Sequence, residues 1–268
     1  MPVDLRNPLR QLLKEGKPTI GTHIFVSQPM MVETIGNTGL FDYVEFFSTY
    51  APFDFHDLDM MALAAERYNM GSMIKIDPEP MMYLAQRSII AGFGSILFAD
   101  LRTLKEVETA ISSVRADPKG VMGCSEGRIG GYRMTLEYGA DKQFVKYCDD
   151  IVVAIMLEKK SLVDKIEDVC NMDGVDMIQY GPCDYAMTVG VHGQFKHPKV
   201  VEADRKIIKT ALKYDKHPRI EIGGDTIDKQ MAEYQKLGVT DFSLGTDLGI
   251  VHTWMKKNGR AARKLLGR

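Results

Sequence analysis

The sequence has little cysteine and no excess of either charge, and both shortages exclude classes of protein. Four cysteines occur among 268 residues. Cys124, Cys148, Cys170 and Cys183 have none of the short paired spacings of a zinc site or a disulfide framework. We therefore expect reduced thiols in a cytoplasmic protein. The formal net charge is only −2, so composition gives no reason to expect binding to nucleic acid or to a membrane surface.

Long apolar runs are missing as well. No stretch approaches the roughly 20 residues that a membrane-spanning helix needs. The opening MPVDLR leads into a charged segment and not into the apolar centre of a secretory signal, so we expect no targeting or membrane segment. What the chain does have is 45% hydrophobic residues, enough for a large core. Its 17 methionines are interpreted as filling that core.

Strand-like and helix-like patterns alternate along the whole chain. The strands are predicted at residues 18–26, 41–47, 71–76, 94–98, 121–123, 151–158, 175–180, 219–223 and 241–245. The helices are predicted at residues 30–37, 57–68, 79–91, 103–114, 161–170, 200–214, 226–237 and 247–266. About eight such units over this length favour a single (β/α)8 TIM barrel that spans residues 1–268. The alternative, an open doubly wound sheet, is disfavoured because no G-x-G-x-x-G follows the first strand.

Two carboxylates mark the ends of predicted strands. Glu158 closes the run IVVAIMLE, and Asp184 follows VDMIQYGPCD. In a parallel barrel the carboxyl ends of the strands converge on one mouth, so these side chains are expected to approach each other there. Two carboxylates repel unless they are protonated or neutralised. A hard cation such as Mg²⁺ or Mn²⁺ fits, with Co²⁺ as a further possibility, although helix capping and pairing with a basic residue remain alternatives.

Lys75 and Tyr50 also fall near predicted strand ends. Lys75 is the cation within the strand MIK and is interpreted as a point charge for a substrate carboxylate. A lysine that only extends toward solvent, or one that forms a Schiff base, is the alternative. Tyr50 follows an aromatic strand, so it either packs under a loop or presents its phenol at the mouth as a hydrogen-bond donor or acid.

Five segments taken in order resemble the HpcH/HpaI aldolase and citrate lyase family. They are DYVEFFSTYAP (42–52), MIKIDP (73–78), PKGVMG (118–123), MLE (156–158) and GVDMIQYGPCD (174–184). The similarity extends over residues 21–249, and the last segment with its spacing from Glu158 is the most specific part. Each segment alone would carry little weight.

The resemblance implies a TIM barrel of the phosphoenolpyruvate/pyruvate-binding type and a divalent-metal-dependent lyase or aldolase that acts on a 2-oxo acid such as pyruvate. It places the metal on Glu158 and Asp184, and substrate contacts at Gly181, Pro182 and Cys183. It also implies a homo-oligomer, most often a hexamer, in which the terminal helix (247–266) packs on a neighbouring subunit.

The sequence departs from the family pattern at four positions. Tyr50 and Phe47 stand where the family has a histidine and its aspartate partner, so the usual acid–base pair is absent. Lys75 stands for an arginine, and Met156 for a glutamine. The proton carrier is therefore expected to be Tyr50 or a water molecule on the metal, with His23 and His56 as other options.

A glycine-rich loop is predicted at residues 124–139. Its Arg128 and Arg133 are interpreted as a clamp for an anionic substrate that closes over the mouth, or else as solvated loop residues. The expected function is cleavage or formation of a carbon–carbon bond next to a 2-oxo acid. Decarboxylation of an oxaloacetate-like acid is one alternative, and a barrel that binds metal and 2-oxo acid without turnover is another.

Overall fold

Eight parallel strands form a closed barrel in the computed structural model, as the alternating pattern predicts. The structure describes residues 6–125, 127–130, 132, 141–224 and 226–267. The strands are β1 (Thr19–Ile24), β2 (Tyr43–Phe46), β3 (Gly71–Ile76), β4 (Ser95–Phe98), β5 (Val152–Leu157), β6 (Met177–Tyr180), β7 (His217–Ile222) and β8 (Asp241–Thr246). Neighbouring strands pair in chain order, and β8 pairs with β1, so the sheet has no free edge.

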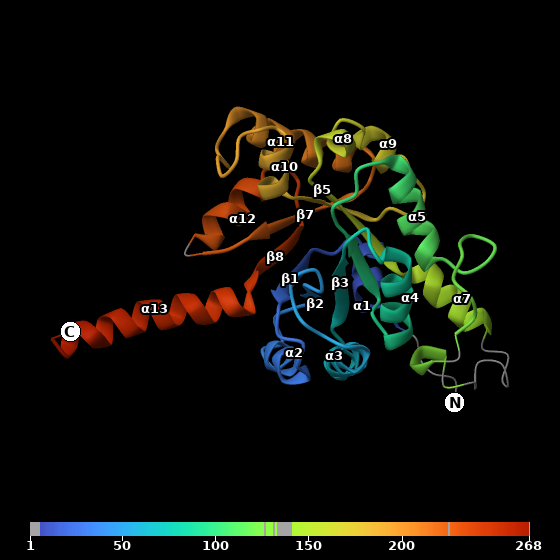
Figure 1. Ribbon diagram of the computed structural model, residues 1–268, viewed down its shortest axis with the longest axis horizontal. Helices are drawn as coiled ribbons and strands as arrows, with labels where there is room; N and C mark the ends of the chain where they lie inside the picture. Colours follow the sequence, from blue (N-terminus) through green and yellow to red (C-terminus); the bar gives the residue numbers. More distant parts are fainter. Residues whose placement is uncertain (1–5, 126, 131, 133–140, 225, 268) are drawn as a thin grey trace.

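Helices cover the outside of the barrel (Figure 1). Those described are α1 (Pro8–Lys14), α2 (Pro29–Gly36), α3 (Phe55–Arg67), α4 (Met81–Ala91), α5 (Leu104–Val114), η1 (Arg128–Gly130), α7 (Asp141–Asp150), α8 (Lys160–Val163), α9 (Ile166–Cys170), α10 (Pro182–Thr188), α11 (Pro198–Lys213), α12 (Ile227–Gln235) and α13 (Asp247–Leu265). Among the described residues, none of these helices is both long enough and apolar enough to cross a bilayer.

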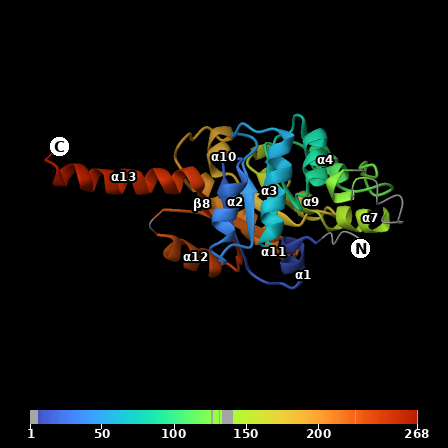
Figure 2. The same cartoon turned by 90° about the horizontal axis from the view of Figure 1, so that it is seen from below.

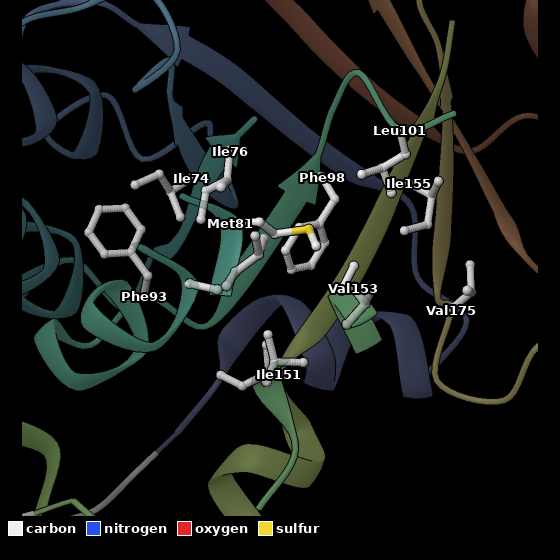
Figure 3. Packing of buried hydrophobic residues seen from close by; sticks show 14 of the residues in the cluster. Ile74, Ile76, Met81, Phe93, Phe98, Leu101, Ile151, Val153, Ile155 and Val175 are labelled. Atoms are coloured by element: carbon white, nitrogen blue, oxygen red, sulfur yellow. The ribbon is translucent and has the colours of Figure 1, made fainter. Parts of the chain in front are cut away.

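The larger part of the core lies between the strands and the helices. Ile74, Ile96 and Ile155 point outward from their strands and are buried against the helical layer. Figure 3 shows this packing around Phe93, Phe98 and neighbouring aliphatic side chains. Because parallel strands are buried on both faces, their sequences read as nearly continuous apolar runs. This explains why β4 and β5 were recognisable from the sequence.

A second, smaller apolar cluster fills the lower half of the barrel interior. Met73, Ala154 and Met177 point inward from their strands, and Leu9 and Leu13 of α1 pack with them. Helix α1 therefore covers the end of the barrel at which the strands begin. The opposite end, the mouth, is left for polar side chains and for solvent.

Local sequence signals account for several helix starts. Thr103 caps α5 by accepting from the Glu106 N–H, while the Glu106 carboxylate accepts from the Thr103 N–H, so the predicted capping box is confirmed. Asp54 and Asp57 form the same reciprocal pair at the start of α3. Each box satisfies backbone donors that the first helical turn leaves unpaired.

The strand predicted at residues 121–123 is wrong. This segment makes one isolated bridge, Ala116 to Met122, and does not join the barrel. Three residues are too short to span a barrel wall, and the eight other predicted strands already close the sheet. Much of the predicted loop at 124–139, including Arg133, lies outside the described residues.

Helix α13 extends away from the barrel. Both views show it projecting from the end of β8 with no other element beside most of its length (Figures 1 and 2). Of its residues, all of which are described, only Asp247 is buried. Ile250, Val251, Trp254 and Met255 are exposed large apolar side chains on its surface.

Candidate active site

The C-terminal ends of the strands surround one open cavity of about 940 Å³. The structure brings most of the predicted site residues to it: Tyr50, Lys75, Glu158, Gly181, Pro182, Cys183 and Asp184. Glu158 follows β5 directly, while the residues from Pro182 to Asp184 form the first turn of α10 after β6. Parallel strand ends thus place side chains from four distant parts of the sequence around one space.

Glu158 is the buried carboxylate of the site, with only 4% of its surface exposed. Its Oε1 accepts a hydrogen bond of 2.6 Å from the backbone N–H of Asp100. Burial raises the pKa of Glu158, and the charge of Asp184 adds to this, while the Asp100 N–H and Lys75 oppose it. Gly181 makes room for the carboxylate, since a Cβ there would lie 2.6 Å from Glu158 Oε2.

Asp184 is more exposed and has a cationic partner. Its Oδ1 accepts from Lys159 Nζ at 2.7 Å. The same ammonium group forms an ion pair with Asp100, so Lys159 joins the ends of β4, β5 and β6. The alternative of pairing with a basic residue is therefore realised for Asp184, through one of its two oxygens.

Negative charge is in excess around Glu158. The charge of Asp184 acts on both Glu158 and Asp77. Burial, together with the charges of Asp100 and Asp184, raises the pKa of Asp77. Against these four carboxylates stand the ammonium groups of Lys75 and Lys159, together with the guanidinium of Arg102, which pairs with Asp100. The carboxylates outnumber the cations, as is typical of a site that takes up a metal cation.

The carboxylate oxygens of Glu158 and Asp184 fit a hard metal ion that takes its remaining ligands from water or substrate. Within the described part of the chain, no three side chains of His, Cys, Asp or Glu are grouped closely enough to hold a metal ion by themselves. Glu158 and Asp184 supply carboxylate oxygens only, which suits Mg²⁺ or Mn²⁺ better than soft metals. Mg²⁺ in particular is commonly held by one or two carboxylates, with water and substrate oxygens completing its shell.

Lys75 remains a cation facing the same cavity. Burial alone would lower its pKa, but the hydrogen bond to Tyr50 and the charges of Glu158 and Glu45 raise the pKa of Lys75 above its ordinary value. Its Nζ donates to the Tyr50 hydroxyl at 3.1 Å and lies 4.9 Å from the Tyr50 ring centroid. A protonated amine is a poor nucleophile, so this geometry favours ion pairing over Schiff-base formation.

Tyr50 presents its hydroxyl to solvent and not to the core. The residue is 61% exposed, and its oxygen accepts from Lys75, which leaves its own O–H free to donate into the cavity. Phe47 beside it is buried and packs edge-on against the Tyr50 ring. The interpretation of Tyr50 as mere packing under a loop therefore does not hold.

A buried polar network lies one layer below the cavity, and the sequence did not reveal it. Arg219 is fully buried and donates from Nε to the Tyr43 hydroxyl at 2.6 Å and from Nη1 to Gln179 Oε1. Its Nη1 also forms an ion pair with Glu45 at 2.5 Å. Burial would raise the pKa of Glu45, but the charge of Arg219 outweighs this and holds it at about 2.

His23 belongs to this network and is not available at the mouth. It is fully buried, and its Nε2 lies 3.2 Å from Arg219 Nη2 and 3.0 Å from Ser243 Oγ. A guanidinium can only donate hydrogen bonds, so we assign Nε2 as an acceptor and place the proton on Nδ1, which lies 3.0 Å from the Gly245 carbonyl oxygen. His56 is exposed at the start of α3 and does not line the cavity.

The prediction that Arg128 closes over the mouth is corrected by the structure. Arg128 lies in η1, where its guanidinium pairs with Glu66 at 2.7 Å and donates to the Ala91 carbonyl. Ala91 ends α4 and precedes β4, so Arg128 is placed at the end of the barrel where the strands begin. Its charge is already satisfied there, and it does not line the cavity.

Four charged residues of the region were missed from the sequence: Asp77, Asp100, Lys159 and Glu221. Asp77, Asp100 and Lys159 each come within two residues of the end of an apolar strand, which is the signal that identified Glu158. Glu221 and Arg219 alternate along β7, and two charges at every second position of a buried strand indicate one inward-facing row.

Comparison with known proteins agrees with this geometry. The sequence profile described as HpcH/HpaI aldolase/citrate lyase matches residues 54–220. A curated relative, the 5-keto-4-deoxy-D-glucarate aldolase of Klebsiella pneumoniae, is 25% identical over 258 residues, which cover 96% of this chain and 97% of the relative.

Solved structures share the fold. An HpcH/HpaI aldolase from Desulfitobacterium hafniense superposes with a TM-score of 0.85 at 19% identity, covering 96% of this chain and 97% of the other. A citrate lyase beta subunit from M. tuberculosis, complexed with oxaloacetate and magnesium, has a TM-score of 0.56 at 10% identity, covering 87% and 93%. With its profile match over more than half of the sequence, the chain belongs to the HpcH/HpaI aldolase/citrate lyase family.

Proposed function

We propose that this protein is a divalent-metal-dependent carbon–carbon lyase or aldolase that acts on a 2-oxo acid. The observation that carries the proposal is the buried carboxylate of Glu158, which faces a cavity together with Asp184 and lies in a region rich in carboxylates. The magnesium bound to the citrate lyase beta subunit and the aldolase activity named for the Klebsiella relative support the same reaction class.

Each residue of the cavity has a distinct part in this proposal. Glu158 and Asp184 would hold Mg²⁺ or Mn²⁺, which supplies Lewis-acid stabilisation of negative charge on the substrate. Lys75 attracts the substrate carboxylate as a point charge. Tyr50 donates its O–H toward oxygen atoms of the substrate, while the first turn of α10, from Gly181 to Cys183, forms the adjacent wall.

A second candidate reaction is the decarboxylation of an oxaloacetate-like acid. It is favoured by Phe47, a buried apolar side chain packed on His23 with ring centroids 4.5 Å apart, because no imidazole faces the cavity from this position. Decarboxylation requires stabilisation of the developing negative charge but no base to start the reaction. A barrel that binds metal and 2-oxo acid without turnover is the alternative from another class.

The proposal is tested by metal removal and replacement. Purified protein should release pyruvate from oxaloacetate or from a 4-hydroxy-2-oxo acid, lose this activity in EDTA, and regain it with Mg²⁺, Mn²⁺ or Co²⁺. Glu158→Gln and Asp184→Asn should abolish Mn²⁺ binding in calorimetry, while Glu108→Gln on the exposed face of α5 should bind as the wild type does. Metal-dependent binding of pyruvate without any release of product would instead identify a binding protein.

We further propose that the active form is a homo-oligomer, most simply a hexamer, in which α13 packs on a neighbouring subunit. The support is the exposed apolar surface of this helix and its projection from the barrel. The beginning of α13 also lines the cavity, through Ile250 and Trp254. A neighbour that covers this helix would therefore also enclose one side of the candidate site.

A further inference from the structure

Glu221 is a carboxylate of the cavity that neither the metal site nor the buried network uses. It lies two residues after Arg219 on β7, so its side chain points inward one layer above the guanidinium. Its side chain is 42% exposed, and it lines the same cavity as Lys75 and Glu158. The charges of Glu221, Asp184 and Glu158 all act on the thiol of Cys183, which places them around one space.

The carboxylate of Glu221 has no strong partner. Its Oε1 lies 3.6 Å from His23 Nδ1, which is beyond hydrogen-bond distance, and the Nδ1 proton is directed to the Gly245 carbonyl. In the part of the chain that the structure describes, no other group forms a hydrogen bond or ion pair with this carboxylate. By contrast, Glu158 accepts from a backbone N–H, and Asp184 accepts from Lys159.

Two other candidate proton carriers, His23 and Tyr50, are already engaged by neighbouring groups. His23 is buried, and its Nε2 lone pair is directed toward Arg219. The Tyr50 oxygen accepts from Lys75, and its O–H is a hydrogen-bond donor. The carboxylate of Glu221, which faces the cavity without a hydrogen-bond partner among the described residues, has free acceptor oxygens for a proton.

We propose that Glu221 is the group that exchanges a proton with the substrate, an inference that rests on the proposed lyase function. In cleavage of a 4-hydroxy-2-oxo acid, Glu221 accepts the proton of the C4 hydroxyl as the C3–C4 bond breaks. The bond electrons pass to C3 and the keto group, and C4 leaves as an aldehyde. The protonated Glu221 then returns its proton to C3, which completes pyruvate without an external oxidant or reductant.

Two reactions of small substrates separate proton transfer from bond cleavage. Exchange of the pyruvate methyl protons for deuterium requires a base at C3, and NMR in D₂O with Mg²⁺ measures its rate. Cleavage of carbon dioxide from oxaloacetate takes no proton from the substrate. Both rates are measured for the wild-type protein, for Glu221→Gln and for Glu108→Gln, with thermal unfolding of each to establish that it is folded.

The expected result is a fall of about 100-fold or more in the ratio of exchange to decarboxylation in Glu221→Gln, the size of a lost general base. Glu108→Gln should keep the wild-type ratio. A ratio for Glu221→Gln within threefold of the wild-type value overturns the assignment of Glu221. Wild-type decarboxylation without any exchange also overturns it while leaving a metal-dependent decarboxylase standing. A wild-type protein that catalyses neither reaction refutes the proposed function itself.

Discussion

At the scale of single residues, the barrel interior contains an apolar layer of side chains and, next to it, a charged layer. Met73 and Met177 form part of an apolar lower layer, whereas Glu45 and Arg219 bring opposite charges into full burial above it. Moving such groups out of water is costly, and their mutual attraction offsets the cost only when both partners remain. The Tyr43 hydroxyl and Gln179 give Arg219 further acceptors, so the guanidinium is well satisfied.

Replacing Glu45 by glutamine should therefore destabilise the protein by about 3 kcal/mol or more, because it leaves the Arg219 charge buried without its counter-ion. The folded-state pKa of Glu45, about 2, is below its ordinary value of 4.5. Its contribution to stability is thus present above pH 4.5 and is lost as pH falls toward 2.

Urea denaturation at several pH values measures this effect. The difference in unfolding free energy between wild type and Glu45→Gln should be largest near pH 7 and should shrink below pH 4.5. A difference that does not change with pH would show that the ion pair is not the cause. Glu108→Gln serves as the exposed control.

Gly181 permits a test of the metal site that leaves both carboxylates in place. A Cβ at this position would lie 2.6 Å from Glu158 Oε2, so Gly181→Ala must displace the Glu158 side chain. We expect Mn²⁺ affinity in calorimetry to fall at least tenfold, because the two carboxylates would no longer converge. Gly123→Ala is the matched control, since its Cβ would meet nothing within 4 Å. Equal Mn²⁺ affinities in the two variants would argue against Glu158 as a ligand.

At the scale of elements, the sequence predicted the barrel because its physical signals are local. Apolar runs marked the buried strands, and the capping box of Thr103 and Glu106 marked the start of α5. The element that was predicted wrongly and those that were missed also have local causes. Residues 121–123 have a strand-like composition but too little length, and α1 and α7 were not recognised at all.

The candidate site was predictable where a carboxylate closes an apolar run, as Glu158 does. It was not predictable where partners come from distant strands. Arg128 is basic and lies in a glycine-rich stretch, but its pairing with Glu66 on α3 depends on the tertiary fold. The same holds for Glu45, whose ion pair joins β2 to β7 across the barrel interior. Neither of these long-range contacts has a signature in a single sequence.

Helix α13 is fixed to the barrel through the carboxylate of Asp247. This group accepts hydrogen bonds from the backbone N–H groups of Phe25, Val26 and Leu248, with donor–acceptor distances between 2.7 and 3.1 Å. The first two donors follow β1, so one side chain ties the start of α13 to the loop beyond a neighbouring strand. The remainder of the helix has no comparable attachment in the described structure.

Asp247→Asn should weaken this attachment, because the amide has one acceptor oxygen instead of two and carries no charge. We expect a loss of about 1–3 kcal/mol in the unfolding free energy. Amide hydrogen exchange at Phe25 and Val26 should also be faster in this variant than in the wild type. Asp228→Asn, at an exposed position in the first turn of α12, is the control. Unchanged exchange at both amides would contradict the anchoring role.

At the scale of the whole molecule, the exposed apolar surface of α13 predicts self-association. Light scattering at micromolar protein should give a mass well above 30.1 kDa, the mass of one chain, and removal of residues 248–268 should reduce the particle to a monomer. Apolar side chains such as Val251 and Met255 gain by burial against a second surface. A full-length monomer at this concentration would contradict the prediction.

The tryptophan of this chain offers an independent measurement of assembly. Trp254 is the single tryptophan of the sequence and is 61% exposed on α13. Its emission should shift to shorter wavelength as protein concentration rises and the helix becomes covered. Emission typical of an exposed indole at all concentrations would place the subunit contact elsewhere.

The exposure of the side chains at the mouth has a consequence for how such an enzyme can evolve. Tyr50 is 61% exposed and the Glu221 side chain 42% exposed, whereas Glu45 and Arg219 beneath them are fully buried. Substitutions at exposed positions usually change stability by less than about 0.5 kcal/mol, while those in a buried ion pair endanger folding. New proton-transfer groups can therefore be sampled by mutation at the mouth with little risk to the scaffold. The exposed proton-transfer positions are in this sense less constrained than the buried charges below them.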